Sequence, residues 1–576
     1  MPIETARVLT GVLMLGTGLS LALARTPSVA LFVTLVALGL LLSAAHRVLT
    51  ASRSPLPMLQ IGLGAAFGVL AAVALGWPGL DLRTLAYLVA AALVLRGLAG
   101  ALEAMLGPRS QRAAAAALGS ASVLLGLLVL LWPRLTVAVL GVALGASLVL
   151  GGLDLVLRPL LAGRRSAAPA ERGPRHRSTL AAALALALTL VAVGGSLWLH
   201  AGDPRTVPDA FYTPPLVVPD EPGSLIRSEP LDRGVPQGAR AWRILYTTTG
   251  HDGSPAVSSG TVLAPSGGGP EVGELPVVSV AHGTTGVMPH CAPSLGAQPF
   301  ADGAAAALEA IVRDGHAAVL TDYPGLGTAG PHPYLVGPSE AHSVWDALRA
   351  ARQLPEVRLG DSTVVWGHSQ GGHAALWTGM LARTYAPELE LLGVAAFAPA
   401  TDLYSLADGI KEDPAGKIVS AYIATAWTDV YPDLDLPAAI TPRYRGIVER
   451  IGERCFLGRD VLAAVAPASQ LFEPVLSEES LRGGLGTALR RNTPTADIEV
   501  PVLLAQGDAD TLVLPQMQRD WVQAQCAAGH ALDYREYPGL GHLSLVGDQS
   551  PLVADLLDWT ADRTAGTDAR DTCPPG

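Results

Sequence analysis

Acidic residues are scarce and cysteine is absent in the first 200 residues of this sequence. In that part 15 arginines stand against 5 acidic residues, a balance of +10, whereas after it 24 basic residues stand against 45 acidic ones, a balance of −21. An acidic second part without a basic stripe argues against nucleic-acid binding. A chain of 576 residues is also too long for one hydrophobic core, so we expect two or more domains.

Motifs that bind cofactors or metals are lacking as well. No group of histidines and cysteines has the spacing of zinc ligands, and no glycine-rich loop has the form that binds phosphate. We therefore expect no cofactor and no metal. Cysteine is confined to four positions after residue 200, which suggests two disulfides in an exported domain, and four cysteines allow three pairings.

Long apolar runs fill the first 200 residues. About 20 helical residues cross a bilayer, and seven runs are long enough to do so. They cover roughly 8–24, 29–45, 56–77, 84–102, 113–132, 135–157 and 179–199. We interpret the first run as a retained helix rather than a signal peptide, because its flank is acidic as well as basic and a second run follows almost at once.

Arginine is distributed unevenly over the loops between these runs. The N-terminus and the loops at 46–55, 103–112 and 158–178 carry eleven arginines, and the alternate loops carry three. Arginine-rich loops stay in the cytoplasm. We therefore expect a multi-pass cell-membrane protein with a cytoplasmic N-terminus, whose seventh span places everything after residue 200 outside the cytoplasm.

A repeat underlies the apolar runs, because Pro27, Pro78 and Pro133 recur at a spacing of about 50–55 residues. Each proline lies in an outer turn between two helices, so three hairpins packed on small residues would form an all-α six-helix bundle over 1–160. The repeated stretches are "ALARTPSVALFVTLVALGLLLS", "VALGWPGLDLRTLAYLVAAALVL" and "LVLLWPRLTVAVLGVALGASLVL". Over residues 10–160 the pattern resembles the HdeD-like short-repeat membrane proteins, a resemblance that implies no catalytic residues.

Three ionisable residues lie in or beside the spans, namely Arg96, Glu103 and Asp154. All three are near the predicted cytoplasmic ends, where long side chains reach the interface. Since no acid lies at mid-depth, we do not expect a proton relay.

The rest of the chain divides by composition into five segments. We expect a basic cytoplasmic loop at 161–178, a seventh transmembrane helix at 179–200, a proline-rich linker at 201–222, an α/β domain at 223–562 and a tail at 563–576. In the α/β domain, short β-rich runs alternate with helical ones, which indicates a mainly parallel sheet. The predicted strands are "AWRILYTTT", "SSGTVLAP", "LPVVSVAHG", "HAAVLTDYPG", "STVVWGHS", "LLGVAAFAP" and "VPVLLAQGD".

Ser369 lies in a Gly-x-Ser-x-Gly pattern, which is a weak signal alone in a chain with 63 glycines. Its context strengthens it: the strand "STVVW" precedes it, Gly367 and Gly371 flank it, and an alanine-rich helix follows. This is the form of a nucleophile elbow, in which small neighbours leave room for a crowded serine. The alternative is a turn whose serine merely caps the helix.

A serine hydroxyl needs a base, and this kind of site has the chain order serine, acid, histidine. His542 lies between glycine and leucine after a late strand, so we assign it as the base. The acid is Asp508 or Asp510. Many hydrolases of this fold show Gly-x-x-Asp-x-x-Val here, and the match to Gly507 and Val513 favours Asp510.

An oxyanion needs two hydrogen-bond donors aimed at one point. One should be the backbone N–H of Gln370, which follows the nucleophile. The second should come from the loop after "LPVVSVAHG", where Thr284 is the candidate. His373 lies one helical turn past Ser369 and points away from it, so we interpret it as structural.

At this point the residues resemble a known family, the secretory lipases of fungi and actinobacteria. The matching stretches are "DAFYTPP", "AHGTTGVMPHCAPS", "TDYPGLGTAGPHPYLVG", "GHSQGGHAALW" and "GDADTLV", within roughly residues 205–562. The resemblance implies an α/β-hydrolase with a helical cap, active on carboxylic esters including acylglycerols. Its triad falls on Ser369, Asp510 and His542, and its oxyanion loop on Thr284.

The same resemblance favours two disulfides, Cys291–Cys455 and Cys526–Cys573. Secretory members carry a cleaved signal peptide, whereas this chain has predicted spans, which argues against free release. The 90-residue segment 401–490 is too long for a loop, so the cap is expected there.

These features together predict a membrane-tethered serine ester hydrolase outside the cytoplasm, with a lipid or small ester as substrate. An acyltransferase that uses the same triad is one alternative. A non-catalytic membrane scaffold or stress protein with a hydrolase-like domain is another. The sequence does not specify the oligomeric state.

Overall fold

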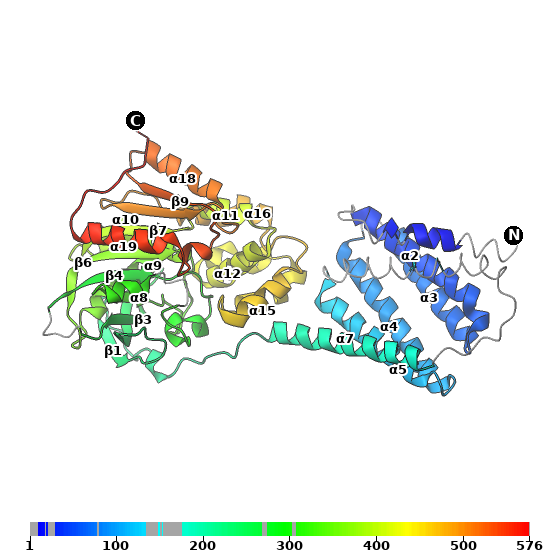
Figure 1. Ribbon diagram of the computed structural model, residues 1–576. Helices are drawn as coiled ribbons and strands as arrows, with labels where there is room; N and C mark the ends of the chain where they lie inside the picture. Colours follow the sequence, from blue (N-terminus) through cyan, green and yellow to red (C-terminus); the bar gives the residue numbers. More distant parts are fainter. Residues whose placement is uncertain are drawn as a thin grey trace. The chain divides into compact units, whose positions relative to one another are not determined.

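The structure is a computed structural model. It describes residues 10–17, 19–20, 29–77, 80–133, 148–149, 153, 175–267, 273–301 and 307–574. The chain divides into two compact units, Met1–His200 and Ala201–Gly576, which are described separately (Figure 1).

The described part of the first unit is helical. Its long helices are α2 (Val29–Thr50), α3 (Pro57–Gly76), α4 (Leu82–Leu106), α5 (Arg112–Leu131) and α7 (Arg175–Ala201). Each contains a stretch long and apolar enough to cross a membrane, so the described residues support five candidate spans. They match the predicted spans 29–45, 56–77, 84–102, 113–132 and 179–199. Of the predicted span 8–24, residues 10–17 and 19–20 are described and helical, but they are not among the candidate spans. The predicted span 135–157 lies largely outside the described residues, and seven spans are therefore not supported.

Small residues let α4 and α5 approach closely. A Cβ built on Gly100 would lie 2.8 Å from the Cα of Gly119, and one built on Gly119 would lie 3.0 Å from the carbonyl oxygen of Gly97. Close backbone approach of this kind is the usual basis of helix association in membranes. The closest packing in the described helices joins α2 to α3 and α4 to α5, across the arginine-rich loops.

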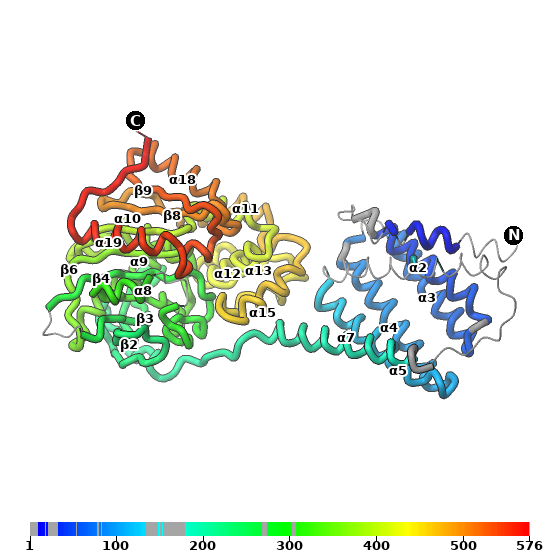
Figure 2. The backbone as a smooth tube through the Cα atoms, in the orientation of Figure 1, coloured from blue at the N-terminus to red at the C-terminus, as the bar shows by residue number. Residues whose placement is uncertain are grey.

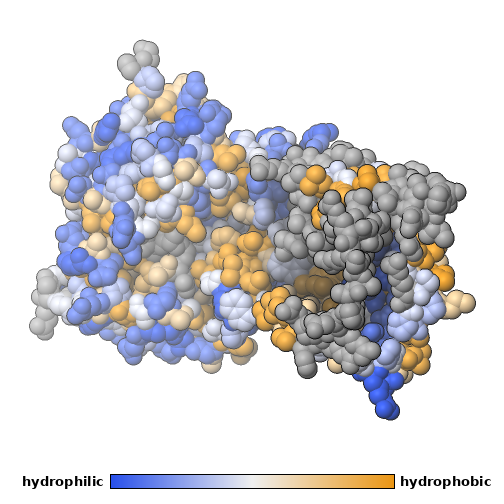
Figure 3. Space-filling model, turned by 45° about the vertical axis from the view of Figure 1, so that its right-hand side comes forward, coloured by the Kyte–Doolittle hydropathy of each residue, from blue (hydrophilic) through white to orange (hydrophobic). Residues whose placement is uncertain are grey.

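Polar side chains connect three of these helices near one end. Arg47 of α2 donates to Gln60 of α3 (2.9 Å), and Gln60 donates to Glu103 of α4 (2.7 Å). Glu103, expected near a cytoplasmic end of its span, accepts a hydrogen bond from a neighbouring helix. Elsewhere α7 exposes large apolar side chains such as Leu180 and Val191, and an exposed apolar surface marks a membrane or protein contact. On the face drawn in Figure 3, by contrast, hydrophilic residues dominate the second unit.

In the second unit, nine strands among the described residues form one mixed sheet in the order β1-β2-β3-β5-β4-β6-β7-β8-β9. Neighbours from β1 to β5 pair antiparallel, and those from β5 to β9 pair parallel. The strands are β1 (Leu225–Pro230), β2 (Ala239–Thr249), β3 (Pro255–Pro265), β4 (Leu275–Ala281), β5 (Ala317–Thr321), β6 (Leu359–His368), β7 (Glu390–Phe397), β8 (Val502–Gly507) and β9 (Asp533–Tyr537). Each of the seven quoted strand predictions overlaps one of β2–β8.

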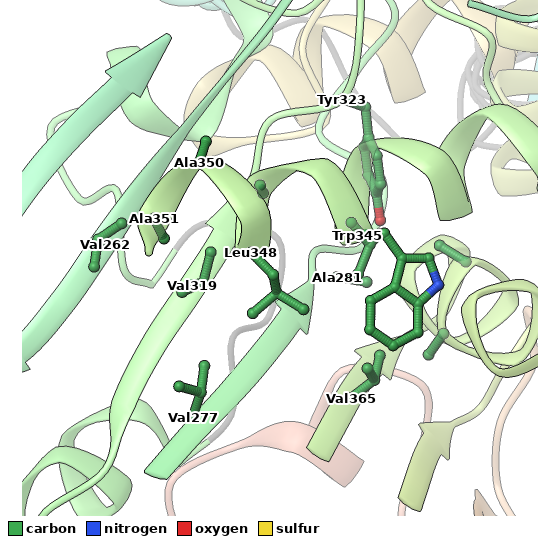
Figure 4. Packing of buried hydrophobic residues seen from close by; sticks show 14 of the residues in the cluster. Val262, Val277, Ala281, Val319, Tyr323, Trp345, Leu348, Ala350, Ala351 and Val365 are labelled. Atoms are coloured by element: carbon green, nitrogen blue, oxygen red, sulfur yellow. The ribbon is translucent and has the colours of Figure 1, made fainter. Parts of the chain in front are cut away.

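Helices cover both faces of this sheet. The helices are α8 (Leu308–Arg313), α9 (Gly337–Ala351), α10 (Gln370–Tyr385), α18 (Pro515–Ala527) and α19 (Pro551–Thr564). One apolar cluster joins the sheet to α9, α10 and α18, and another joins it to α8 and α19. Figure 4 shows α9 packing on the strands, with Trp345 and Leu348 beside Val277, Val319 and Val365. Burial of these side chains fixes the parallel strands whose ends carry the site.

Residues 401–490 form a separate helical group beside the sheet, yellow to light orange in Figure 2. Its helices are α11 (Leu403–Gly409), α12 (Pro414–Val430), α13 (Leu436–Ala439), α14 (Arg445–Gly452), α15 (Gly458–Ala468), α16 (Glu478–Arg482) and α17 (Gly484–Arg491). The group has its own apolar core around Tyr422 and Trp427. Helix α11 ends at Gly409 and α12 begins at Pro414, because a proline suits the first turn of a helix and disfavours helical backbone in the residue before it.

Candidate active site

Ser369 occupies the sharp turn between β6 and α10. Its backbone has φ +58° and ψ −117°, a conformation that costs a residue with a side chain on the order of 1–3 kcal/mol. The neighbouring glycines are required: a Cβ on Gly367 would lie 1.9 Å from the carbonyl oxygen of Gly371, and one on Gly371 would lie 1.9 Å from that of Ala281. The turn therefore holds a serine where only small neighbours fit, as the elbow interpretation expects.

The structure brings together the three residues assigned to the triad. The Nε2 atom of His542 lies 2.9 Å from Oγ of Ser369, and its Nδ1 lies 2.7 Å from Oδ2 of Asp510. With Nδ1–H donating to the carboxylate, Nε2 is left to accept the serine proton. Asp510 follows β8, and His542 lies between β9 and the short 3-10 helix η7 (Ser544–Val546).

Asp510 and Asp508 have different surroundings. Asp510 is buried, and its Oδ1 accepts hydrogen bonds from the backbone N–H groups of Leu512 (2.8 Å) and Val513 (2.9 Å). Those bonds hold its other oxygen toward His542. Asp508 is exposed, and its Oδ1 accepts from the N–H of Gly539 at 2.6 Å. Of the two alternatives, only Asp510 contacts the histidine.

Thr284 and Gln370, the proposed oxyanion donors, line the same pocket as Ser369 and His542. The Oγ1 atom of Thr284 is hydrogen-bonded to the hydroxyl of Tyr334 at 2.9 Å. Either hydroxyl can be the donor in that bond. The backbone N–H of Thr284, and its hydroxyl when Tyr334 is the donor, are therefore the groups that could serve an oxyanion.

The pocket has a volume of about 400 Å³ and extends from Ser369 under the cap. Its lining is mainly apolar, and the cap provides much of it. The apolar lining residues include Leu335, Leu406, Ile418, Val419, Tyr422, Phe456, Leu457, Val461, Leu512, Val513, Leu543 and Val546. A cavity of this size and character fits a hydrocarbon chain.

His368, the last residue of β6, lies against the base. Its ring centroid is 4.6 Å from that of His542, and its Nε2–H donates to the backbone oxygen of His542 at 3.0 Å. Burial, with a further contribution from His542, holds the pKa of His368 well below its usual range. His368 is therefore neutral near pH 7 and positions the base without adding a charge.

Sequence reasoning missed a buried polar network under the elbow. Oε2 of Glu340 in α9 lies 2.8 Å from Nδ1 of His373, and the Nε2 of His373 lies 2.7 Å from the backbone oxygen of Asn492. The other carboxylate oxygen accepts from Nε2 of Gln370 (2.8 Å) and the N–H of Leu335 (2.9 Å). His373 is structural, as expected. No local pattern marks Glu340 or Asn492, because their partners are distant in the chain.

Both disulfides implied by the resemblance are present. The Cα atoms of Cys291 and Cys455 are 5.2 Å apart, and those of Cys526 and Cys573 are 5.5 Å apart. In the described residues, His290, Cys291 and Cys455 have their ligand atoms within 4.8 Å of one another. Because both sulfurs are in a disulfide, this group does not offer thiolates to a metal.

Solved structures resemble the second unit. Lipase A of Candida antarctica in its closed state is 20% identical with a TM-score of 0.52, and the match covers 65% of this chain and 89% of that one. The mixed sheet, the elbow and this likeness define the second unit as an α/β-hydrolase fold.

Sequence comparisons are consistent with that fold. Residues 303–572 match the family model of secretory lipases. A probable inactive lipase of Mycobacterium tuberculosis is 26% identical over 62% of this chain and 82% of its own length. Lipase A of Moesziomyces aphidis is 25% identical over 68% of this chain and 93% of its own.

Proposed function

We propose that the chain is a membrane-tethered serine ester hydrolase that works outside the cytoplasm and cleaves carboxylic esters of lipids through an acyl-enzyme. One observation carries the proposal. Oγ of Ser369 lies 2.9 Å from Nε2 of His542 in a turn that opens into an apolar pocket of about 400 Å³. The match of residues 303–572 to the family model of secretory lipases supports the same activity.

The first half of the reaction acylates Ser369. Oγ attacks the ester carbonyl carbon while Nε2 of His542 takes the hydroxyl proton, and Asp510 stabilises the imidazolium through Nδ1–H. The carbonyl oxygen becomes an oxyanion that accepts hydrogen bonds from the N–H groups of Thr284 and Gln370. The C–O bond to the alcohol then breaks, and His542 gives its proton to the departing oxygen.

The second half restores the serine. Water attacks the acyl carbon while His542 takes one of its protons, and the acid departs as Ser369 regains a proton from Nε2. An alcohol in place of water would give acyl transfer. Because the pocket is mainly apolar, this competition depends on which acceptor reaches the acyl carbon.

Neutral acyl esters suit this site better than phospholipids. The lining is mainly apolar, and the chain after residue 200 carries a balance of −21, which repels anionic head groups. We expect kcat/KM to be higher for acylglycerols or alkyl esters than for phospholipids with the same chains.

Tethering rests on the apolar helices of the first unit and on the arginine distribution in its loops. The helix α7 leads directly into the second unit, so an outward seventh span would export the hydrolase domain. The domain would then work beside the membrane.

A fluorophosphonate probe tests the catalytic assignment. The full-length chain in detergent should be labelled at Ser369, and Ser369→Ala should not be labelled. Esters of graded acyl length, with and without a competing alcohol, then separate hydrolysis from acyl transfer. The similarity to a probable inactive lipase gives the non-catalytic alternative its weight. Absence of both labelling and turnover in the wild type would establish that alternative.

A further inference from the structure

The segment that follows α7 is bound to the cap. Gly202 carries φ +68°, and the next residue, Asp203, donates its backbone N–H to Oδ1 of Asp460 at 2.9 Å. Oδ2 of Asp203 accepts from the N–H of Arg459 at 2.6 Å, and the guanidinium of Arg454 donates to the oxygen of Ala201 at 2.8 Å. We call these contacts of residues 201–203 with residues 454–460 the clasp.

Asp203 caps a helix that is distant in the sequence. Arg459 is in the first turn of α15, whose leading N–H groups have no partner within the helix. A carboxylate at that position satisfies one of them and interacts favourably with the helix dipole. Leu457, which directly precedes the first residue of α15, makes no capping side-chain bond. The side chain that caps α15 is instead that of Asp203, 256 residues before Arg459 in the sequence.

Asp460 completes the clasp from the cap side. It is 4% exposed, and its Oδ2 accepts a hydrogen bond from the N–H of Cys455 at 3.2 Å. Its Oδ1 accepts the hydrogen bond from the N–H of Asp203. The fit is tight, since a Cβ on Gly202 would lie 2.0 Å from Oδ1 of Asp460. A Cβ on Gly458 would lie 2.5 Å from Oδ2 of Asp203.

The clasped segment is also a wall of the pocket. Phe456, Leu457, Gly458 and Val461 line the cavity that contains Ser369. This wall is also bound to the oxyanion loop, because the N–H of Phe456 donates to the backbone oxygen of Thr285 at 2.7 Å. The disulfide Cys291–Cys455 joins the same two segments. The wall is thus held by the oxyanion loop on one side and by the clasp on the other.

We propose that Asp203 is a specificity-determining residue: by capping α15 it fixes the pocket wall 456–461 and favours long acyl chains. This inference rests on the proposed ester hydrolysis. Asp203 follows the predicted seventh span, so the proposal gives a linker residue a role in the acyl site. A short acyl group needs the triad and oxyanion donors but little of the wall.

The test compares octanoate and acetate esters of 4-nitrophenol on the full-length chain in detergent. Asp203→Ala removes the cap of α15, and Gly202→Ala separates the same groups sterically. In both variants the octanoate/acetate ratio of kcat/KM should fall about 4- to 15-fold, since each methylene that loses its contact accounts for about fourfold. In Asp203→Asn, which keeps an oxygen acceptor, the octanoate/acetate ratio of kcat/KM should fall less.

Asp209→Ala is the matched control. Asp209 lies in the same linker and pairs with Arg243 at 2.9 Å, away from the cap, so the ratio should not change. Rates are expressed per Ser369 site labelled by the fluorophosphonate, which removes any effect of misfolded protein. An unchanged ratio in Asp203→Ala and Gly202→Ala, or an equal loss on both esters, would overturn the inference while wild-type activity stands. A wild type that is neither labelled nor active would instead overturn the proposed function, and this inference with it.

Discussion

Glu340 and His373 form a fully buried pair, with Oε2 of Glu340 2.8 Å from Nδ1 of His373, behind the turn that holds Ser369. The Nε2 of His373 faces the carbonyl oxygen of Asn492, which can only accept, so Nε2 carries a proton. A second proton lies in the hydrogen bond between Nδ1 of His373 and Oε2 of Glu340. Glu340 also binds Gln370 and the backbone of Leu335. One carboxylate therefore connects the elbow helix, α9 and the pocket lining.

Removing that carboxylate should destabilise the second unit. We expect Glu340→Ala to lower the free energy of unfolding by about 3–5 kcal/mol, because it leaves several buried polar groups without their hydrogen-bond partner. These groups are Nδ1 of His373, Nε2 of Gln370 and the N–H of Leu335. Glu340→Gln, which keeps the shape and one acceptor, should cost about 1–3 kcal/mol. Thermal unfolding followed by tryptophan fluorescence measures both. Glu309→Ala is the control, because it removes only an exposed ion pair with Arg313. It should change the free energy of unfolding by about 0–0.5 kcal/mol.

Asp510→Asn should lower kcat by about 10⁴-fold on a short ester, since the amide cannot hold His542 in the acceptor tautomer. Asp508→Asn should change kcat by much less, because it only weakens a turn at Gly539. Steady-state kinetics on the acetate ester compares the two. An inactive Asp508→Asn beside an active Asp510→Asn would reverse the assignment of the acid.

Stability should fall as the pH falls below about 6.5. Burial lowers the pKa of His332 to about 3, so between pH 3 and 6.5 the unfolded chain binds a proton that the folded one does not. The contribution of His332 is complete above pH 6.5 and decreases by up to about 1.4 kcal/mol for each pH unit below it. Burial raises the pKa of Asp322 and Asp346, which act in the opposite direction.

The comparison of wild type with His332→Asn isolates that contribution, because both chains keep the aspartates. His332 donates from Nδ1 to the oxygen of Pro324 and accepts at Nε2 from Gln370, as a neutral ring does. Melting temperatures between pH 7.5 and 5 should decrease less steeply in the variant. Parallel curves would show that the pKa of His332 in the folded chain is close to its value in the unfolded chain, which would contradict the prediction.

The predicted topology has a direct test. A protease added to intact cells should cleave after residue 201, whereas a tag inserted in the loop 164–178 should stay protected, because its arginines retain it in the cytoplasm. Permeabilised cells serve as the control in which both are cut. Cleavage at the tag with a protected C-terminal domain would reverse the orientation.

The sequence was sufficient for those parts of the fold that local pattern determines. The strands around Val277, Val319 and Val365 are continuous apolar runs, and burial on both faces produces such runs. The edge strand β1, "LIRSEP", is half-exposed, lacks that signal and was not predicted. The break between α11 and α12 has a local cause, because Pro414 disfavours helical backbone in the residue before it.

The site shows the same division. Ser369 and His542 lie at strand ends with glycine neighbours, so the order of motifs along the chain was informative. Asp203, by contrast, is an ordinary linker residue in sequence, and its partner Arg459 is 256 residues away. Contacts of this range depend on how the sheet and cap assemble, which no local pattern records.

The positive φ of Ser369 has a consequence for the history of such proteins. Glycine would adopt φ +58° without the cost that serine bears, so selection for folding alone favours losing the hydroxyl at this turn. Catalysis and thermal stability thus oppose each other at one residue. A lineage released from the need to cleave esters could gain stability by that single replacement and retain the rest of the fold as a binding surface.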